Sequence, residues 1–188
     1  MRLLITILLL ASLPVFYGCV AAVVGGAAAG GYLVGEDRRA TAVQADDKTI
    51  DFRVSNRISE KYKDAHVNAT PYNRLVLLTG EVPSEEAKAD IEKITREVAD
   101  VRGVYNELAV GPVKPITSRT NDTYLTSLVK TRFLDAQRFN PVHVKVVTED
   151  GTVYLMGVVK RAEADAATEV ARTTRGVRRV VRVFEYQD

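Results

Sequence analysis

The sequence contains very few of the residues that build disulfides and metal sites. Its 188 residues include one cysteine, two histidines and no tryptophan. One cysteine cannot form a disulfide within the chain, so a disulfide-stabilised scaffold is excluded. The histidines, His66 and His143, stand 77 residues apart (143 − 66), and no cysteine or acidic cluster accompanies them at a metal-ligand spacing. We therefore predict no metal site and expect both histidines to be solvated strand residues.

Motifs for catalysis are missing as well. The sequence has no Gly-x-Ser-x-Gly nucleophile elbow and no Gly-x-x-x-x-Gly-Lys phosphate-binding loop. No cofactor is implied by any other pattern. The sequence therefore favours a protein that is not an enzyme.

Charge is nearly absent from the first 35 residues, where Arg2 is the only charged side chain. Arg2 is followed by an apolar run from Leu3 to Leu10 and then by small residues, which is typical of a secretory signal peptide. We assign this signal peptide to residues 1–18. The apolar run is too short to span a bilayer, which takes about 20 apolar residues. An uncleaved membrane hairpin that uses residues 20–34 as a second apolar segment is the alternative.

The single cysteine follows this leader directly. The stretch "FYGC", Phe16 to Cys19, resembles the lipobox of bacterial lipoproteins, although Phe16 and Tyr17 are unusual there. The resemblance implies that Cys19 is acylated and that residues 19–45 form a lipidated, flexible tether. Val20 stands where lipoproteins retained in the inner membrane typically carry Asp, which implies delivery to the outer membrane. The alternative is an incidental cysteine in a signal peptide.

The rest of the sequence is a tandem repeat. The segments "LVLLTGEV" and "VYLMGVVK" superpose on Gly80 and Gly157, and "VRGVYNEL" matches "TRGVRRVV" further on. We place the two copies at residues 46–112 and 121–188, joined by a linker at 113–120; the stretch from Gly111 to Thr120 contains two prolines.

Each copy predicts the order helix, strand, strand, helix, strand. In the second copy, Asn121 or Asp122 can cap a helix that runs to about Gln137. Alternating valines from Val142 predict a first strand, and Asp150-Gly151 predicts a tight hairpin turn. A second helix over 162–174 and a last strand over 177–186 complete the copy. The first copy repeats this order, and Pro83 and Ser84 begin its second helix.

Together these patterns predict an α+β protein. The module length, the glycine that ends the second strand and the "RGV" before the third resemble BON domains, a name from bacterial OsmY and nodulation. A lipobox followed by two such modules resembles the dual-BON outer-membrane lipoproteins over nearly the whole chain. The resemblance implies two αββαβ units, each with a three-stranded mixed sheet packed against two helices.

The two copies differ in charge. Residues 36–115 carry 13 basic and 15 acidic side chains, whereas residues 116–188 carry 12 basic and 9 acidic ones. The second copy is therefore the basic one, and arginines gather near its end at Arg172, Arg175, Arg178, Arg179 and Arg182. A solvated basic face and an anionic bilayer are both possible readings. An exported protein seldom meets nucleic acid, so no nucleic-acid partner is expected.

The first helix of the second copy carries the candidate site. Leu125, Val129 and Phe133 form its core stripe, and further apolar and cationic residues lie beside that stripe. An interfacial helix combines residues of these kinds, although they could instead pack on the first module. In the resembling lipoproteins the second BON module binds anionic phospholipid through this helix. The candidate residues are Tyr124, Leu128, Lys130, Thr131, Arg132, Leu134, Arg138 and Phe139.

We therefore expect a lipoprotein of a Gram-negative bacterium, anchored in the outer membrane by Cys19 and facing the periplasm. The resemblance implies that it binds an anionic phospholipid such as phosphatidylglycerol and supports envelope integrity. The main alternative is an adaptor whose BON modules dock an envelope protein. A role as an osmotic-stress chaperone is a third possibility.

Overall fold

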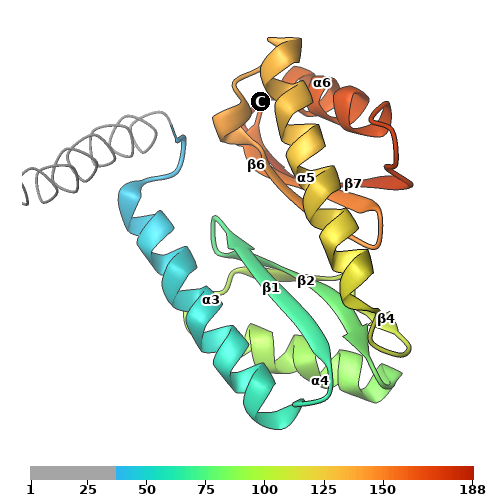
Figure 1. Ribbon diagram of the computed structural model, residues 1–188. Coiled ribbons are helices and arrows are strands. Elements are labelled where there is room, and N and C mark those ends of the chain that lie inside the picture. Colours follow the sequence, from blue (N-terminus) through green and yellow to red (C-terminus); the bar gives the residue numbers. More distant parts are fainter. Residues whose placement is uncertain (1–36) are drawn as a thin grey trace, which may run out of the picture. The chain divides into compact units, whose positions relative to one another are not determined.

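The computed structural model describes residues 37–188, of which residues 38–188 form one compact unit (Figure 1). The expected signal peptide and Cys19, the expected acylation site, lie outside the described residues. Within residues 37–188, no helix combines the length and the apolar character that are needed to cross a bilayer.

The first module contains two helices and one sheet. Its elements are α3 (Thr41–Lys61), β1 (His66–Tyr72), β2 (Leu75–Val82), α4 (Glu85–Arg96), β3 (Gly103–Asn106) and β4 (Ala109–Val110). The second helix begins as predicted, because Ser84 caps α4 by accepting a hydrogen bond from the Ala87 N–H (3.2 Å).

The second module repeats this order with one added turn. Its elements are α5 (Ile116–Ala136), the 3-10 turn η2 (Pro141–His143), β5 (Lys145–Glu149), β6 (Thr152–Val159), α6 (Arg161–Arg172) and β7 (Arg179–Tyr186). The predicted α+β fold with tandem αββαβ units is confirmed.

Both sheets are mixed, as predicted. β1 pairs with β2 and β5 with β6 in antiparallel fashion, whereas β3 and β7 run parallel to β2 and β6. The first sheet has four strands and not three, because β3 stops at Asn106 and the chain rejoins β2 as the short strand β4. β7 pairs without interruption along β6 from Arg179 to Tyr186.

Each module has its own core between its helices and one face of its sheet. In the first module, Val76 and Leu78 of β2 pack with Ile91 of α4 and with the buried apolar residues of α3, which are Ile50, Val54 and Ile58. In the second module, Val153 and Leu155 of β6 pack against α5 and α6. The buried face of α6 is mostly alanine, which lets this helix lie close to the sheet.

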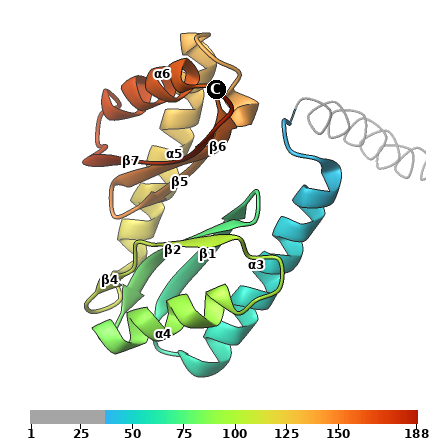
Figure 2. The same ribbon diagram turned by 180° about the vertical axis from the view of Figure 1, so that it is seen from behind.

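The opposite faces of the two sheets pack against each other. Tyr72 and Leu77 from the first sheet meet Tyr154, Met156 and Val183 from the second, and all five are buried. The order of layers is therefore helices, sheet, sheet, helices, as Figure 2 shows from behind. The expected alternative, in which the apolar side of α5 closes against the first module, is not what joins these two modules.

Polar contacts surround this apolar junction. Lys145 donates to the Pro71 carbonyl (3.2 Å), Asn73 donates to Glu185 (2.7 Å), and Arg102 donates to the same carboxylate (2.5 Å). Burial lowers the pKa of Lys145. The junction thus combines an apolar centre with hydrogen bonds at its edge.

The chain just before α3 also contacts both modules. Arg38 donates two hydrogen bonds to Glu163 on α6 (2.6 and 2.8 Å). Arg39 pairs with Asp47 on α3 (2.6 Å), and its guanidinium lies 3.9 Å from the centre of the Tyr72 ring. The expected flexible tether to residue 45 is therefore too long, because Thr41 begins α3 and the two arginines before it are fixed.

The expected start of α5 at Asn121 or Asp122 is wrong. The helix begins at Ile116, directly after Pro115 and inside the segment expected to be a linker. Asp122 is buried and does not cap the helix. It accepts hydrogen bonds from the Asp150 and Gly151 N–H groups (2.9 and 2.8 Å). This contact holds the hairpin turn that the Asp150-Gly151 dipeptide predicted.

The first strand of the second module begins later than predicted. Pro141 to His143 form a 3-10 turn that the Asn140 side chain caps through the Val142 N–H (3.1 Å), and β5 starts at Lys145. Proline has no N–H to give to a sheet, which favours this turn. His143 is therefore not a strand residue, whereas His66 begins β1 as expected.

Candidate lipid-binding surface

α5 has one buried side and one exposed side. Leu125, Val129 and Phe133 are buried in the core of the second module, which confirms the predicted stripe. The opposite side faces solvent. Tyr124 is 63% exposed and Leu134 is 64% exposed.

Ile116 extends this exposed side and is 73% exposed. Eighteen residues separate Ile116 from Leu134, which at 3.6 residues per turn returns to the same side of a helix. Ile116 was not expected on this surface, because it lies in the segment that was predicted to be a linker. The "PIT" segment at 115–117, with proline just before an apolar residue, is a helix-start signal that could have included it.

The remaining candidates divide into two groups. Leu128 is half-buried beside the exposed side, and Lys130, Thr131 and Arg138 are exposed. The Thr131 hydroxyl donates to the Ser127 carbonyl (3.0 Å), so it is used within the helix. Within residues 37–188, neither Lys130 nor Arg138 forms an ion pair, which leaves both cations available to an external anion.

Arg132 and Phe139 do not belong to this exposed side. Arg132 joins α5 to α6 by donating to the Val170 carbonyl (3.2 Å) and to the Thr174 hydroxyl (2.8 Å). The Phe139 ring packs edge-on against Phe133 at 4.9 Å between centroids and lies against the core. The expectation that these two residues share the surface is corrected, because their side chains are used inside the module.

The arginines near the end of the chain are mostly paired. Arg178 contacts Asp150, Arg179 contacts Glu107, Arg182 contacts Asp165 and Arg172 contacts Glu169. Lys114 also contacts Asp150, and the hydrogen bond from Lys114 is the main cause that lowers the pKa of this carboxyl. These neighbours offset much of the basic charge that the sequence suggested as a lipid-facing cluster.

We define the outer face of α5 by the residues that the structure leaves exposed or half-exposed on one side. They are Ile116, Tyr124, Leu128, Lys130, Thr131 and Leu134. Arg138 was expected on this helix, but it follows the end of α5 at Ala136 and the left-handed Gln137. An aromatic ring with aliphatic neighbours and unpaired cations can rest at the headgroup level of a bilayer while the cations meet phosphate. No catalytic arrangement is needed for this chemistry.

Comparison with known proteins agrees with the repeated architecture. The BON domain model matches residues 46–112 and 121–188. The outer membrane lipoprotein DolP of Haemophilus influenzae is 38% identical over 174 residues, which cover 91% of this chain and 90% of that protein.

Two further relatives match over shorter spans. A 21 kDa hemolysin of Actinobacillus pleuropneumoniae is 33% identical over 80% of this chain and 79% of its own length. The osmotically-inducible protein Y of Escherichia coli is 29% identical over 72% of this chain and 70% of its own length. With both modules matched and a full-length relative at this identity, the chain belongs to the BON-domain family and, within it, to the DolP-like proteins with two BON domains.

Proposed function

We propose that the protein is a non-enzymatic outer-membrane lipoprotein that faces the periplasm and supports envelope integrity. Its similarity to the outer membrane lipoprotein DolP supports an envelope role. The lipobox-like "FYGC" stretch supports an acyl anchor on Cys19, with residues 1–18 removed as a signal peptide. Two or more acyl chains make such anchoring stable.

We further propose that the outer face of α5 binds anionic phospholipid of the phosphatidylglycerol class. The observation that carries this proposal is the exposure of Tyr124 and Leu134 on a helix whose other side is fully packed. The two modules join through their sheets, so their junction does not use this side of α5.

The expected affinity of this face for a bilayer is modest. Each cation near an anionic surface contributes about 1 kcal/mol. Lys130 is the unpaired cation on the face, and Arg138 is a second exposed cation just beyond the helix end at Ala136. An acyl anchor would raise the effective concentration of lipid at α5, so weak contacts suffice to hold the helix on the membrane.

Vesicle flotation of the fragment 38–188 tests the lipid proposal. This fragment lacks the anchor, so flotation reports on the modules alone. We expect it to float with vesicles that contain phosphatidylglycerol and to remain behind with vesicles of phosphatidylcholine. The double variant Tyr124→Ala, Leu134→Ala is expected to lose most of the bound fraction.

Phe52→Ala is the matched control, because Phe52 is an equally exposed aromatic residue (69%) on α3 of the first module. Its flotation should equal that of the unchanged fragment. Equal and poor flotation with both kinds of vesicle would contradict the lipid proposal.

That result would favour a protein-binding adaptor. Phe52 supports this second candidate function, since a large exposed ring on the first module is a common feature of protein contact surfaces. A crosslinkable amino acid placed at residue 52 and at residue 124 in cells would show which helix meets a protein.

A further inference from the structure

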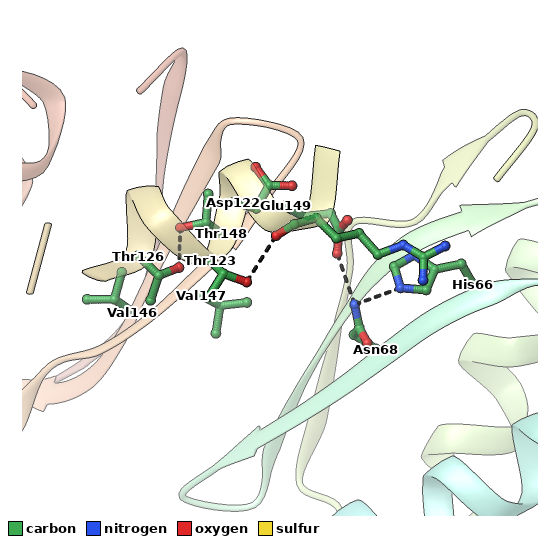
Figure 3. Close-up of a pocket in the computed structure, with 10 residues that line it drawn as sticks. His66, Asn68, Asp122, Thr123, Thr126, Val146, Val147, Thr148 and Glu149 are labelled. Atoms are coloured by element: carbon green, nitrogen blue, oxygen red, sulfur yellow. Dashed lines mark hydrogen bonds between the residues drawn. The ribbon is translucent and has the colours of Figure 1, made fainter. Parts of the chain in front are cut away.

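Three potential metal ligands meet where the first sheet faces the second module. His66 and Glu81 are directly opposite each other on β1 and β2, and Glu149 ends β5 of the second module. One ligand atom from each of the three residues lies within 4.8 Å of the others. Figure 3 shows His66 and Glu149 approaching from the two modules, with Asn68 between them.

The distances are close to those of a shared metal ion. Zinc lies about 2.0 to 2.2 Å from imidazole nitrogen and carboxylate oxygen, so neighbouring ligands of a tetrahedral site are about 3.4 Å apart. His66 Nδ1 and Glu81 Oε2 are already 3.2 Å apart. Glu149 ends β5, and its carboxylate lies within 4.8 Å of the other two ligand atoms.

Burial makes this cluster different from a solvated group of acids. The Glu81 side chain is 3% exposed and the His66 side chain 18% exposed, so the expectation that His66 is solvated is wrong. Besides His66, Glu81 accepts a long hydrogen bond from the Lys114 backbone N–H (3.3 Å). The Lys114 ammonium contacts Asp150 instead of Glu81. A buried carboxylate needs a cation or several hydrogen bonds to offset its lost hydration.

Other charges around the site do not supply that cation fully. A cavity of about 350 Å³ adjoins His66 and Glu149, and Arg119 and Asp122 also line it. Asp122 uses both of its oxygens on the hairpin turn. Arg119 donates to the Lys114 carbonyl (3.3 Å) and forms no ion pair with Glu81 or Glu149.

Asn68 holds one of the three ligands. Its side-chain amide donates to Glu149 Oε2 (3.1 Å). Metal ligands are commonly held by outer hydrogen-bond partners of this kind, which fix the carboxylate in one orientation.

We propose that His66, Glu81 and Glu149 bind a divalent transition metal of the zinc class, with water completing the coordination. The ion would join β1 and β2 of the first module to β5 of the second and so fasten the two BON domains together. An imidazole with two carboxylates suits zinc, whereas magnesium prefers oxygen ligands and retains its waters. The proposal does not depend on lipid binding by α5.

The second module offers a matched control. The residues 77 positions beyond His66 and Glu81 are His143 and Val158, so this copy has the histidine without the carboxylate. The two histidines also hold equivalent places in their modules. The His66 carbonyl lies against Gly80, and the His143 carbonyl lies against Gly157. His143 thus reports on zinc binding by a similar histidine outside the cluster.

Calorimetric titration of the tag-free full-length chain in detergent tests the site. After treatment with EDTA, we expect one zinc ion to bind per chain in the micromolar range, no binding of magnesium, and a higher unfolding temperature with zinc. His66→Gln and Glu149→Gln should each weaken zinc binding about tenfold or more. His143→Gln should leave it unchanged.

Unfolding of each variant in EDTA shows whether it is folded before its zinc affinity is compared. The site is refuted if no saturable zinc binding occurs, or if His143→Gln weakens binding as much as His66→Gln does. Zinc binding that survives Glu149→Gln would refute the bridge between the modules.

Discussion

Two buried aspartates, Asp47 and Asp122, hold the hairpin turns of the two modules. Asp47 accepts hydrogen bonds from the Asn73 and Arg74 N–H groups (2.9 and 2.7 Å), as Asp122 does from the turn of the second module. Both turns have positive φ at their two central residues, so their N–H groups point toward the first helix. The aspartates thus link the first helix of each module to its sheet.

We expect Asp122→Asn to lower the free energy of unfolding by about 1–3 kcal/mol. The asparagine oxygen can accept from one of the two turn N–H groups, but the asparagine NH2 group then faces the other N–H, and two donors cannot form a hydrogen bond. Asp135→Asn is the control, since Asp135 is an exposed acid on the same helix. Urea unfolding measures both. A loss of equal size in the two variants would contradict the role given to Asp122.

The role of Asp122 could not be read from its local pattern. An Asn-Asp pair before an apolar stripe is a strong capping signal. It predicted that α5 starts at Asn121 or Asp122, five or six residues after the observed start at Ile116. Gly80 and Gly157, near the ends of the second strands, stand out in the sequence repeat. The reason why each position requires a glycine appears only in three dimensions. A Cβ on Gly80 or Gly157 would lie 2.0 or 2.4 Å from the carbonyl oxygen of His66 or His143.

At the scale of elements, the helices and the strand order could be predicted because their apolar periods are clear. The outcome for α5 was mixed, since the sequence cannot tell an exposed Leu134 from a Phe139 that folds back onto its own core. One signal for the junction was available but not used. The run from Val153 to Val159 is apolar at almost every position, which is typical of a strand that is buried on both faces.

The pair between Arg38 and Glu163 gives an element-scale prediction. Hydrogen bonds from Arg38 are the main cause that lowers the pKa of Glu163 from 4.5 to about 2. A carboxyl with a lowered pKa stabilises the fold at pH values above 4.5, and this contribution is lost as the pH falls toward 2. We therefore expect Glu163→Gln to unfold at lower temperature than the wild type at pH 7, with the difference shrinking below pH 4.5.

Asp165→Asn is the comparison, because Asp165 lies on the same helix as Glu163 and forms an exposed ion pair with Arg182 of β7. Exposed pairs contribute little, so this variant should follow the wild type at every pH. Thermal unfolding followed by circular dichroism between pH 7 and pH 2 provides the measurement. A difference between Glu163→Gln and wild type that stays constant over this range would contradict the prediction.

At the scale of the molecule, two complete cores are joined by a third, smaller one. Each module buries its own helix–sheet core, and the sheet–sheet cluster adds Tyr72, Leu77, Tyr154, Met156 and Val183. Small domains gain much of their stability from such added burial. Arg38 and Arg39 add to this junction, because Arg38 pairs with Glu163 of the second module and Arg39 pairs with Asp47 of the first.

Met156→Ala tests whether the junction couples the modules. Met156 is buried between the sheets, and its truncation should cost about 2–5 kcal/mol through lost contacts and a cavity. We expect the unchanged fragment 38–188 to unfold in a single calorimetric transition. Because each module keeps its own core, we expect the Met156→Ala variant to unfold in two. Leu155→Ala, one residue earlier on the opposite face of β6, removes core contacts of the second module and leaves the junction intact, so it should lower the temperature of the single transition without dividing it. If Met156→Ala unfolds in one transition as sharp as that of the wild type, the modules do not depend on this junction for their coupling, and the contacts made by Arg38, Lys145 and Glu185 must be sufficient.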